Sequence, residues 1–185
     1  MPLDPNLKAC LDYIESHNWK DFSFEKVARH TGIPLVDFYH SFQDKSAVIT
    51  ALIAHIDARM LESLSPLEGE GSPKEILFEI ILTRLEIATP YKKVFQTLFE
   101  ECLSDPLSSL LISQKGLGSV QWMLEQAGLN PYGWQGLLRV QGLTILYLYT
   151  LKVWFSDSSP DMEKTMAVLD RGLGRVEKLA GALSL

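Results

Sequence analysis

The chain has 185 residues, of which 46% are hydrophobic and 22% charged, and a formal net charge of −6. This composition is typical of a folded protein with a sizeable core, and the negative charge disfavours nonspecific binding to nucleic acid, which depends on Lys and Arg side chains. The N-terminus lacks a signal-peptide pattern, and the longest apolar stretch, 143–155, is too short to cross a bilayer and contains Lys152, so a cytoplasmic protein is expected.

Four helices are predicted before a linker at 65–73. The first covers about 4–17. Ser23 is a good N-cap for the second, which ends at Gly32, and a short third helix covers 34–40 with Pro34 in its first turn. Asp44 caps the fourth helix, which extends to about residue 64. Residues 1–64 are therefore expected to form a small N-terminal domain with a connecting helix.

Five more helices are predicted after the linker, at about 73–88, 90–103, 106–127, 132–155 and from 160 onwards. Three dipeptides pair an N-cap residue with a proline at the first helical position, and they mark the starts of the last three helices: Asp105–Pro106, Asn130–Pro131 and Ser159–Pro160. The sequence therefore predicts an all-α protein of about nine helices, with a second domain over 73–185.

Two N-terminal segments, "FSFEKVARHTGI" at 22–33 and "FYHSFQDKSAVI" at 38–49, have the spacing of a helix-turn-helix that binds DNA. They resemble the TetR family of bacterial transcriptional regulators, with the family's Tyr, Phe and Lys at Tyr39, Phe42 and Lys45. The resemblance implies a TetR-like fold in which the helix near 34–41 enters the major groove of an operator, while Tyr39 and Lys45 contact phosphate.

Charge in this segment is mixed, since residues 1–60 hold more acidic than basic side chains. Lys26, Arg29 and Lys45 are the candidate phosphate contacts, and His40 adds positive charge when protonated. Asp37 departs from the family's pattern and would be repelled by phosphate, although a carboxylate can accept a hydrogen bond from a cytosine amino group. The DNA-binding prediction thus rests on Lys26, Arg29, Tyr39, His40 and Lys45, with Asp37 opposing it.

The C-terminal segment at 148–179, through "VWFSDSSPD" and "LDRGL", is similar to the ubiquinone-biosynthesis accessory proteins. Those proteins keep a TetR-like fold with a vestigial helix-turn-helix, and an apolar cavity holds an isoprenoid lipid. This resemblance implies a second hypothesis of a different class, a lipid-binding accessory protein that no longer binds DNA.

The second domain is rich in aromatic residues, which favours a pocket for a small apolar ligand. The candidate lining residues are Phe95, Phe99, Trp122, Met123, Trp134 and Tyr147. The alternative is an aromatic core without a pocket, and the sequence leaves both open.

The last helix has apolar residues at alternating steps of four and three, which form one stripe: Met162, Met166, Leu169, Leu173 and Val176. The preceding helix, 132–155, is apolar nearly all round. Two such helices from each of two chains would form a four-helix interface, so a homodimer is favoured over packing of both faces inside one chain.

Signals of catalysis are weak. The sequence has no HExxH, GxSxG or phosphate-loop pattern, and Cys10 and Cys102 are far apart with no neighbouring metal ligands. We therefore expect no catalytic residue, metal or cofactor. The leading hypothesis is a TetR-like transcriptional regulator that binds double-stranded DNA as a homodimer and responds to a small apolar or lipid ligand. The accessory-protein reading remains the alternative.

Overall fold

The structure, a computed structural model, describes residues 3–64, 71–104 and 118–182. Helices and turns make up the described residues, and none of them forms a strand, which confirms the all-α prediction. The chain divides into two compact units. The first contains Met1–Ser63 and Ile87–Leu110, and the second contains Leu64–Glu86 and Leu111–Leu185.

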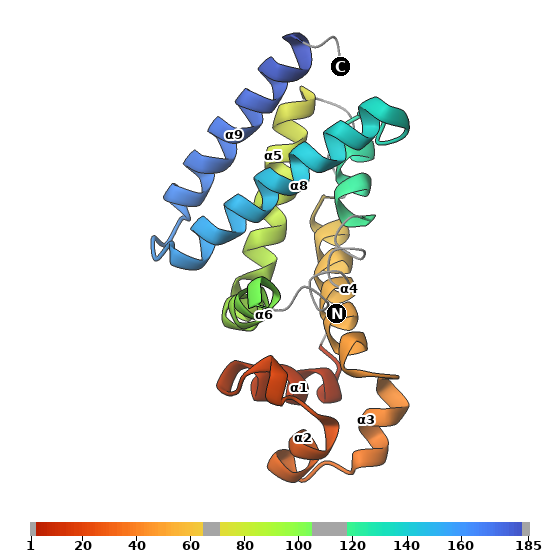
Figure 1. The fold of residues 1–185 in the computed structure, drawn as a ribbon. Helices are drawn as coiled ribbons and strands as arrows, with labels where there is room; N and C mark the ends of the chain where they lie inside the picture. The colour runs from red at the N-terminus through yellow and green to blue at the C-terminus, as the bar shows by residue number, and fades with distance from the viewer. Residues whose placement is uncertain (1–2, 65–70, 105–117, 183–185) are drawn as a thin grey trace. The chain divides into compact units, whose positions relative to one another are not determined.

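The first unit begins with α1 (Pro5–Ser16), the short helix η1 (Trp19–Asp21), α2 (Phe24–Thr31), α3 (Leu35–Ser41) and α4 (Lys45–Leu64) (Figure 1). The predicted N-caps Ser23 and Asp44 are confirmed: Ser23 accepts from Lys26 N at 3.4 Å and Asp44 from Ala47 N at 2.9 Å. Asp4, which the sequence placed only at the start of the first helix, caps α1 by accepting from Leu7 N at 2.9 Å. Each cap satisfies a backbone N–H that the first turn of a helix leaves without a partner.

Aromatic rings fill the centre of this unit. Phe24 stacks on Phe38 and on Phe42 with ring centroids 6.1 Å apart in both pairs, and all three rings are buried. The short helix η2 (Thr89–Tyr91) and α6 (Lys92–Ser104) complete the unit, where α6 packs on α1 and η1. The sequence had placed this helix in the second domain; contacts with α1 group it with the first unit instead.

The second unit contains α5 (Pro73–Ala88) apart from its C-terminal end, a helix described over 118–126, α8 (Gly133–Ser156) and α9 (Glu163–Ala182). The helices α8 and α9 form a hairpin and lie side by side (Figure 1). The Leu146 side chain occupies the space beside Gly172, where a Cβ would lie 2.1 Å from Leu146 Cδ1 and force that side chain to shift. Among the described residues, no helix is both long and apolar enough to span a bilayer.

Two predicted N-cap assignments are wrong, although α8 itself lies within one residue of the predicted range 132–155. Helix α8 has Tyr132 as its N-cap, so Asn130 and Pro131 precede the helix, and Asn130 Oδ1 accepts from Tyr132 N at 2.9 Å to form a turn. Helix α9 begins at Glu163 rather than at Pro160. The third predicted pair, at 105–106, lies outside the described residues.

Side-chain hydrogen bonds at Asp157 explain the late start of α9. The buried Asp157 carboxylate accepts from the backbone N–H and hydroxyl of both Ser159 and Thr165. These bonds hold 157–162 as a loop, in which Met162 has a left-handed φ of 49°. Met162 therefore precedes the helix and does not belong to the helical stripe predicted from its spacing.

Candidate functional site

The helix-turn-helix predicted from the sequence is present in the first unit. Gly32 ends α2 with a left-handed φ of 76°, and its N–H bonds to Ala28 O at 2.8 Å, as a glycine C-cap does. Phe38 is fully buried and holds α3 against α2. Asn6 of α1 donates to Ser41 Oγ at 2.9 Å, which ties the end of α3 to the first helix.

Val36 and Tyr39 are the large side chains most exposed on α3, at 54% and 52%. His40 beside them is also exposed, whereas Asp37 is half-buried and its backbone carbonyl accepts from Asn6 Nδ2 at 3.4 Å. Asp37, whose carboxylate the sequence analysis expected to be repelled by phosphate, is therefore less exposed than Val36. A valine can contact a thymine methyl group but cannot hydrogen-bond to a base.

The side chains expected to contact phosphate already have interactions within the unit. The Tyr39 hydroxyl donates to Glu25 Oε1 at 3.1 Å, which raises the pKa of the phenol. Hydrogen bonds from the Glu25 backbone N–H, the Ser23 hydroxyl and Tyr39 lower the pKa of the Glu25 carboxyl. A charged carboxylate therefore lies beside the hydroxyl that would approach a phosphate.

The three cationic candidates are exposed and differ in their neighbours. Lys26 Nζ lies 3.7 Å from Asp21 Oδ1, and Arg29 Nε donates to Glu25 O at 3.3 Å. Lys45 Nζ lies 4.9 Å from the ring centroid of the buried Trp19, a cation–π contact. Because an exposed ion pair such as that of Lys26 is weak, this lysine remains able to exchange its partner for phosphate.

The six residues predicted to line a ligand pocket are divided between the two units. Phe95 and Phe99 belong to α6 of the first unit, and the other four belong to the second. Met123 is fully buried, whereas Trp134 is 68% exposed on α8 and is corrected to a surface residue. None of the six lines either of the two hollows described next.

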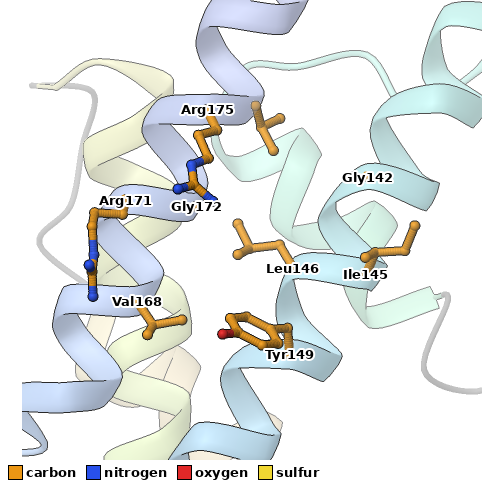
Figure 2. A pocket seen from close by; sticks show the side chains of 9 residues that line it. Gly142, Ile145, Leu146, Tyr149, Val168, Arg171, Gly172 and Arg175 are labelled. Carbon is orange, nitrogen blue, oxygen red and sulfur yellow. The ribbon is translucent and has the colours of Figure 1, made fainter.

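The two hollows differ in chemistry. One, of about 520 Å³, is an open polar depression in the first unit, where α1 and η1 meet Lys93 and Thr97 of α6. The other, of about 370 Å³, is a groove between α8 and α9. Gly142, Ile145, Leu146 and Tyr149 of α8 line it together with five residues of α9 between Val168 and Val176 (Figure 2).

The predicted dimer stripe divides between core and surface. Leu169 and Leu173 are buried inside the chain, because the stripe packs on α8, so the prediction that these two meet a partner is corrected. Met166 and Val176 are half-buried. The larger exposed apolar surface lies on α8 and consists of Trp134, Leu137, Leu138, Ile145, Leu148 and Tyr149. The sequence indicated this surface only because the helix lacks a polar face.

No family model and no curated protein matches the chain. Solved structures that are similar to it include two TetR transcriptional regulators. A TetR transcriptional regulator from Nitrosomonas europaea has 22% identity and a TM-score of 0.71, covering 93% of this chain and 98% of that one. A TetR transcriptional regulator from Rhodococcus sp. RHA1 has 14% identity and a TM-score of 0.63, covering 91% of both chains. The chain therefore has the all-α fold of these TetR transcriptional regulators, and at such identities the likeness is one of fold.

Proposed function

We propose that the protein is a DNA-binding transcriptional regulator. The observation that carries the proposal is the complete helix-turn-helix, in which a capped α2 and the Gly32 turn present Tyr39 and His40 on the exposed side of α3. Lys26, Arg29 and Lys45 supply cations on the flanking segments. Since base-specific contacts from Val36 are restricted to apolar ones, affinity depends mainly on phosphate contacts and on DNA shape.

Selection from random DNA duplexes at low salt tests this proposal. A regulator enriches a defined sequence, and its affinity falls steeply with salt because bound cations release counterions. Lys45→Ala should reduce the slope of log affinity against log salt by about one unit. Lys8→Ala is the matched control, because Lys8 is an exposed lysine of α1 that pairs with Asp12, and the control should leave the slope unchanged. Failure to enrich any sequence would contradict DNA binding.

We further propose that two chains associate through the exposed apolar face of α8. An exposed apolar face of this extent is unusual on a surface that contacts only water. In a dimer with two-fold symmetry, this face of each chain would be buried against the same face of the other chain. Ile145→Lys places a charge in the interface, whereas the side chain is 69% exposed in the single chain and tolerates the change. Sedimentation should show a dimer for the wild type and a monomer for this variant.

A matched control is Leu61→Lys, because Leu61 is an exposed leucine of α4 outside α8. This variant should remain dimeric. A wild-type monomer at micromolar concentration, or equal dissociation of both variants, would contradict association through α8.

A second candidate function is the lipid-binding accessory role. The hydrogen bond from Tyr39 to Glu25 and the exposed Val36 favour it, because both reduce what α3 offers to DNA. Under this alternative no duplex is enriched, and native mass spectrometry of protein from its own host shows a co-purified hydrophobic molecule. Enrichment of an operator sequence would contradict the accessory role.

A further inference from the structure

The groove between α8 and α9 has an apolar floor and walls. Gly142, Leu146 and Gly172 line it, with Ile145 and Tyr149 beside them on α8 (Figure 2). Val176 of α9 also belongs to the lining. A Cβ built at Gly142 would meet no atom within 4 Å, so the groove stays open at this point because a side chain is missing. Its volume of about 370 Å³ is at the lower end of the range for small-molecule sites.

Two arginines give this apolar groove a positive charge. Arg171 and Arg175 are exposed residues one turn apart on α9, and both line the groove. Figure 2 shows the Arg175 side chain beside Gly172 and the Tyr149 hydroxyl directed towards α9. Within the described part of the chain, neither guanidinium forms an ion pair, and Arg171 Nε donates to the carbonyl of its own helix at 2.9 Å.

The acidic residues of α5 and α9 do not line the groove. Asp170 pairs with Lys74 of α5 at 2.7 Å, and α8 contains no Asp or Glu between residues 133 and 156. The groove lining also contains no acid. In a chain of net charge −6, this groove is therefore a local site of uncompensated positive charge next to apolar surface.

We propose that the α8–α9 groove binds a medium-chain fatty carboxylate. A carboxylate head fits the forked N–H groups of Arg175, which bind both of its oxygens, and Arg171 adds a second positive charge. The acyl chain fits the apolar floor between Ile145 and Val176. In the proposed dimer a second copy contacts Ile145 and Tyr149, but it brings two more arginines and no acid to the groove, so a carboxylate, and not that copy, complements the charge of Arg171 and Arg175.

Occupancy of the groove weakens association of two chains. Ile145 and Tyr149 line the groove and also belong to the exposed face of α8, so a bound acyl chain and a partner helix contact the same side chains. Two ligands that compete for one surface each lower the apparent affinity of the other. This regulatory consequence rests on the proposed dimer, whereas fatty carboxylate binding requires only the groove.

Calorimetric titration of the full chain, freed of bound lipid, tests the proposal with dodecanoate below its micelle concentration. Three probes separate head from tail: dodecanol has the tail without the charge, butanoate has the head without the tail, and dodecyltrimethylammonium has the opposite charge. We expect dodecanoate to bind at least tenfold more tightly than each of them. Equal binding of dodecanol and dodecanoate, or no binding of dodecanoate, would overturn the proposal.

Variants locate the site. Arg175→Gln should weaken dodecanoate binding tenfold or more, because it removes a charge-assisted hydrogen bond. Arg59→Gln, at an exposed arginine of α4, is the matched control and should not change it. Gly142→Leu should fill the groove and abolish binding. Arg175→Glu reverses the charge at an exposed position, so the variant should fold and should not bind dodecanoate. It therefore tests the site even if Gly142→Leu does not fold. Unchanged binding by Arg175→Glu would place the ligand elsewhere and overturn the assignment.

Sedimentation with and without dodecanoate tests the regulatory part. Dodecanoate should raise the dimer dissociation constant of the wild type and leave that of Arg175→Glu unchanged. A dissociation constant unaffected by bound dodecanoate would overturn the competition while leaving the binding site supported. A wild-type monomer would contradict the dimer of the proposed function. The calorimetric titration would still show whether the groove binds dodecanoate.

Discussion

Replacement of Leu169 by Ala distinguishes a core residue from an interface residue. The spacing of the last helix placed Leu169 in a dimer stripe, but the side chain is 0% exposed within the single chain. Leu→Ala in a packed core removes buried carbon atoms and leaves a cavity, which together cost about 2–5 kcal/mol. For a chain of this length, each kcal/mol lowers the melting temperature by about 2–4 °C, so we expect a decrease of roughly 6–12 °C for a middle value of about 3 kcal/mol.

Ile145→Ala is the matched comparison, because it also shortens a large aliphatic side chain of the α8–α9 hairpin. Ile145 is 69% exposed, so its loss should change the free energy of unfolding of a single chain by less than about 0.5 kcal/mol. In the proposed dimer this variant should instead change how stability depends on protein concentration.

The assay is urea unfolding followed by far-UV circular dichroism at several protein concentrations. Leu169→Ala should lower the unfolding midpoint by the same amount at every concentration, whereas Ile145→Ala should reduce the dependence of the midpoint on concentration. A loss for Leu169→Ala below about 1 kcal/mol, well under the range for a buried leucine, would refute the placement of this side chain in the core.

Three further predictions concern α2, α8 and the loop before α9. Glu25→Gln removes the charge beside the Tyr39 hydroxyl and should tighten binding to a selected duplex about two- to fivefold, because an exposed carboxylate there weakly repels phosphate; weaker binding in a gel-shift assay would count against this role. Gly136→Ala should destabilise the protein by about 1–3 kcal/mol, since a Cβ there would lie 2.1 Å from backbone of the preceding loop, whereas Gly142→Ala should stabilise it by about 0.5–1 kcal/mol; equal melting temperatures would contradict this. Hydrogen bonds from the Ser159 hydroxyl, and then from Thr165, hold the pKa of Asp157 well below its usual range, so this carboxylate stabilises the fold above about pH 4 and loses that effect as the pH falls further; the difference in melting temperature between wild type and Asp157→Asn should therefore shrink below pH 4, and a constant difference would contradict it.

The sequence by itself determined α1, α2, α3 and α4, together with the Gly32 turn. Ser23, Gly32 and Asp44 act through hydrogen bonds and backbone angles within a few residues, so their effect can be recognised without knowing what packs nearby. The same locality explains the two errors at helix starts. A proline after Asn or Ser is compatible with a first helical turn, but at Asp157 a side chain that bonds eight residues ahead selected a loop instead.

Only the tertiary structure decided which apolar side chains are core and which are surface. Regular spacing shows that residues share one face of a helix, but it does not say what covers that face. Leu169 follows the stripe and is buried by α8, while Ile145 lies on a helix that is apolar nearly all round and is left exposed. The α8–α9 groove depends in addition on Gly142 of α8 and Gly172 of α9, which lie far apart in the sequence. It also depends on the ion pair between Asp170 and Lys74, because Asp170 is absent from the groove lining and Arg175 lies beside apolar surface. Burial and charge pairing are properties of side chains brought together by folding, so no local pattern in the sequence determined them.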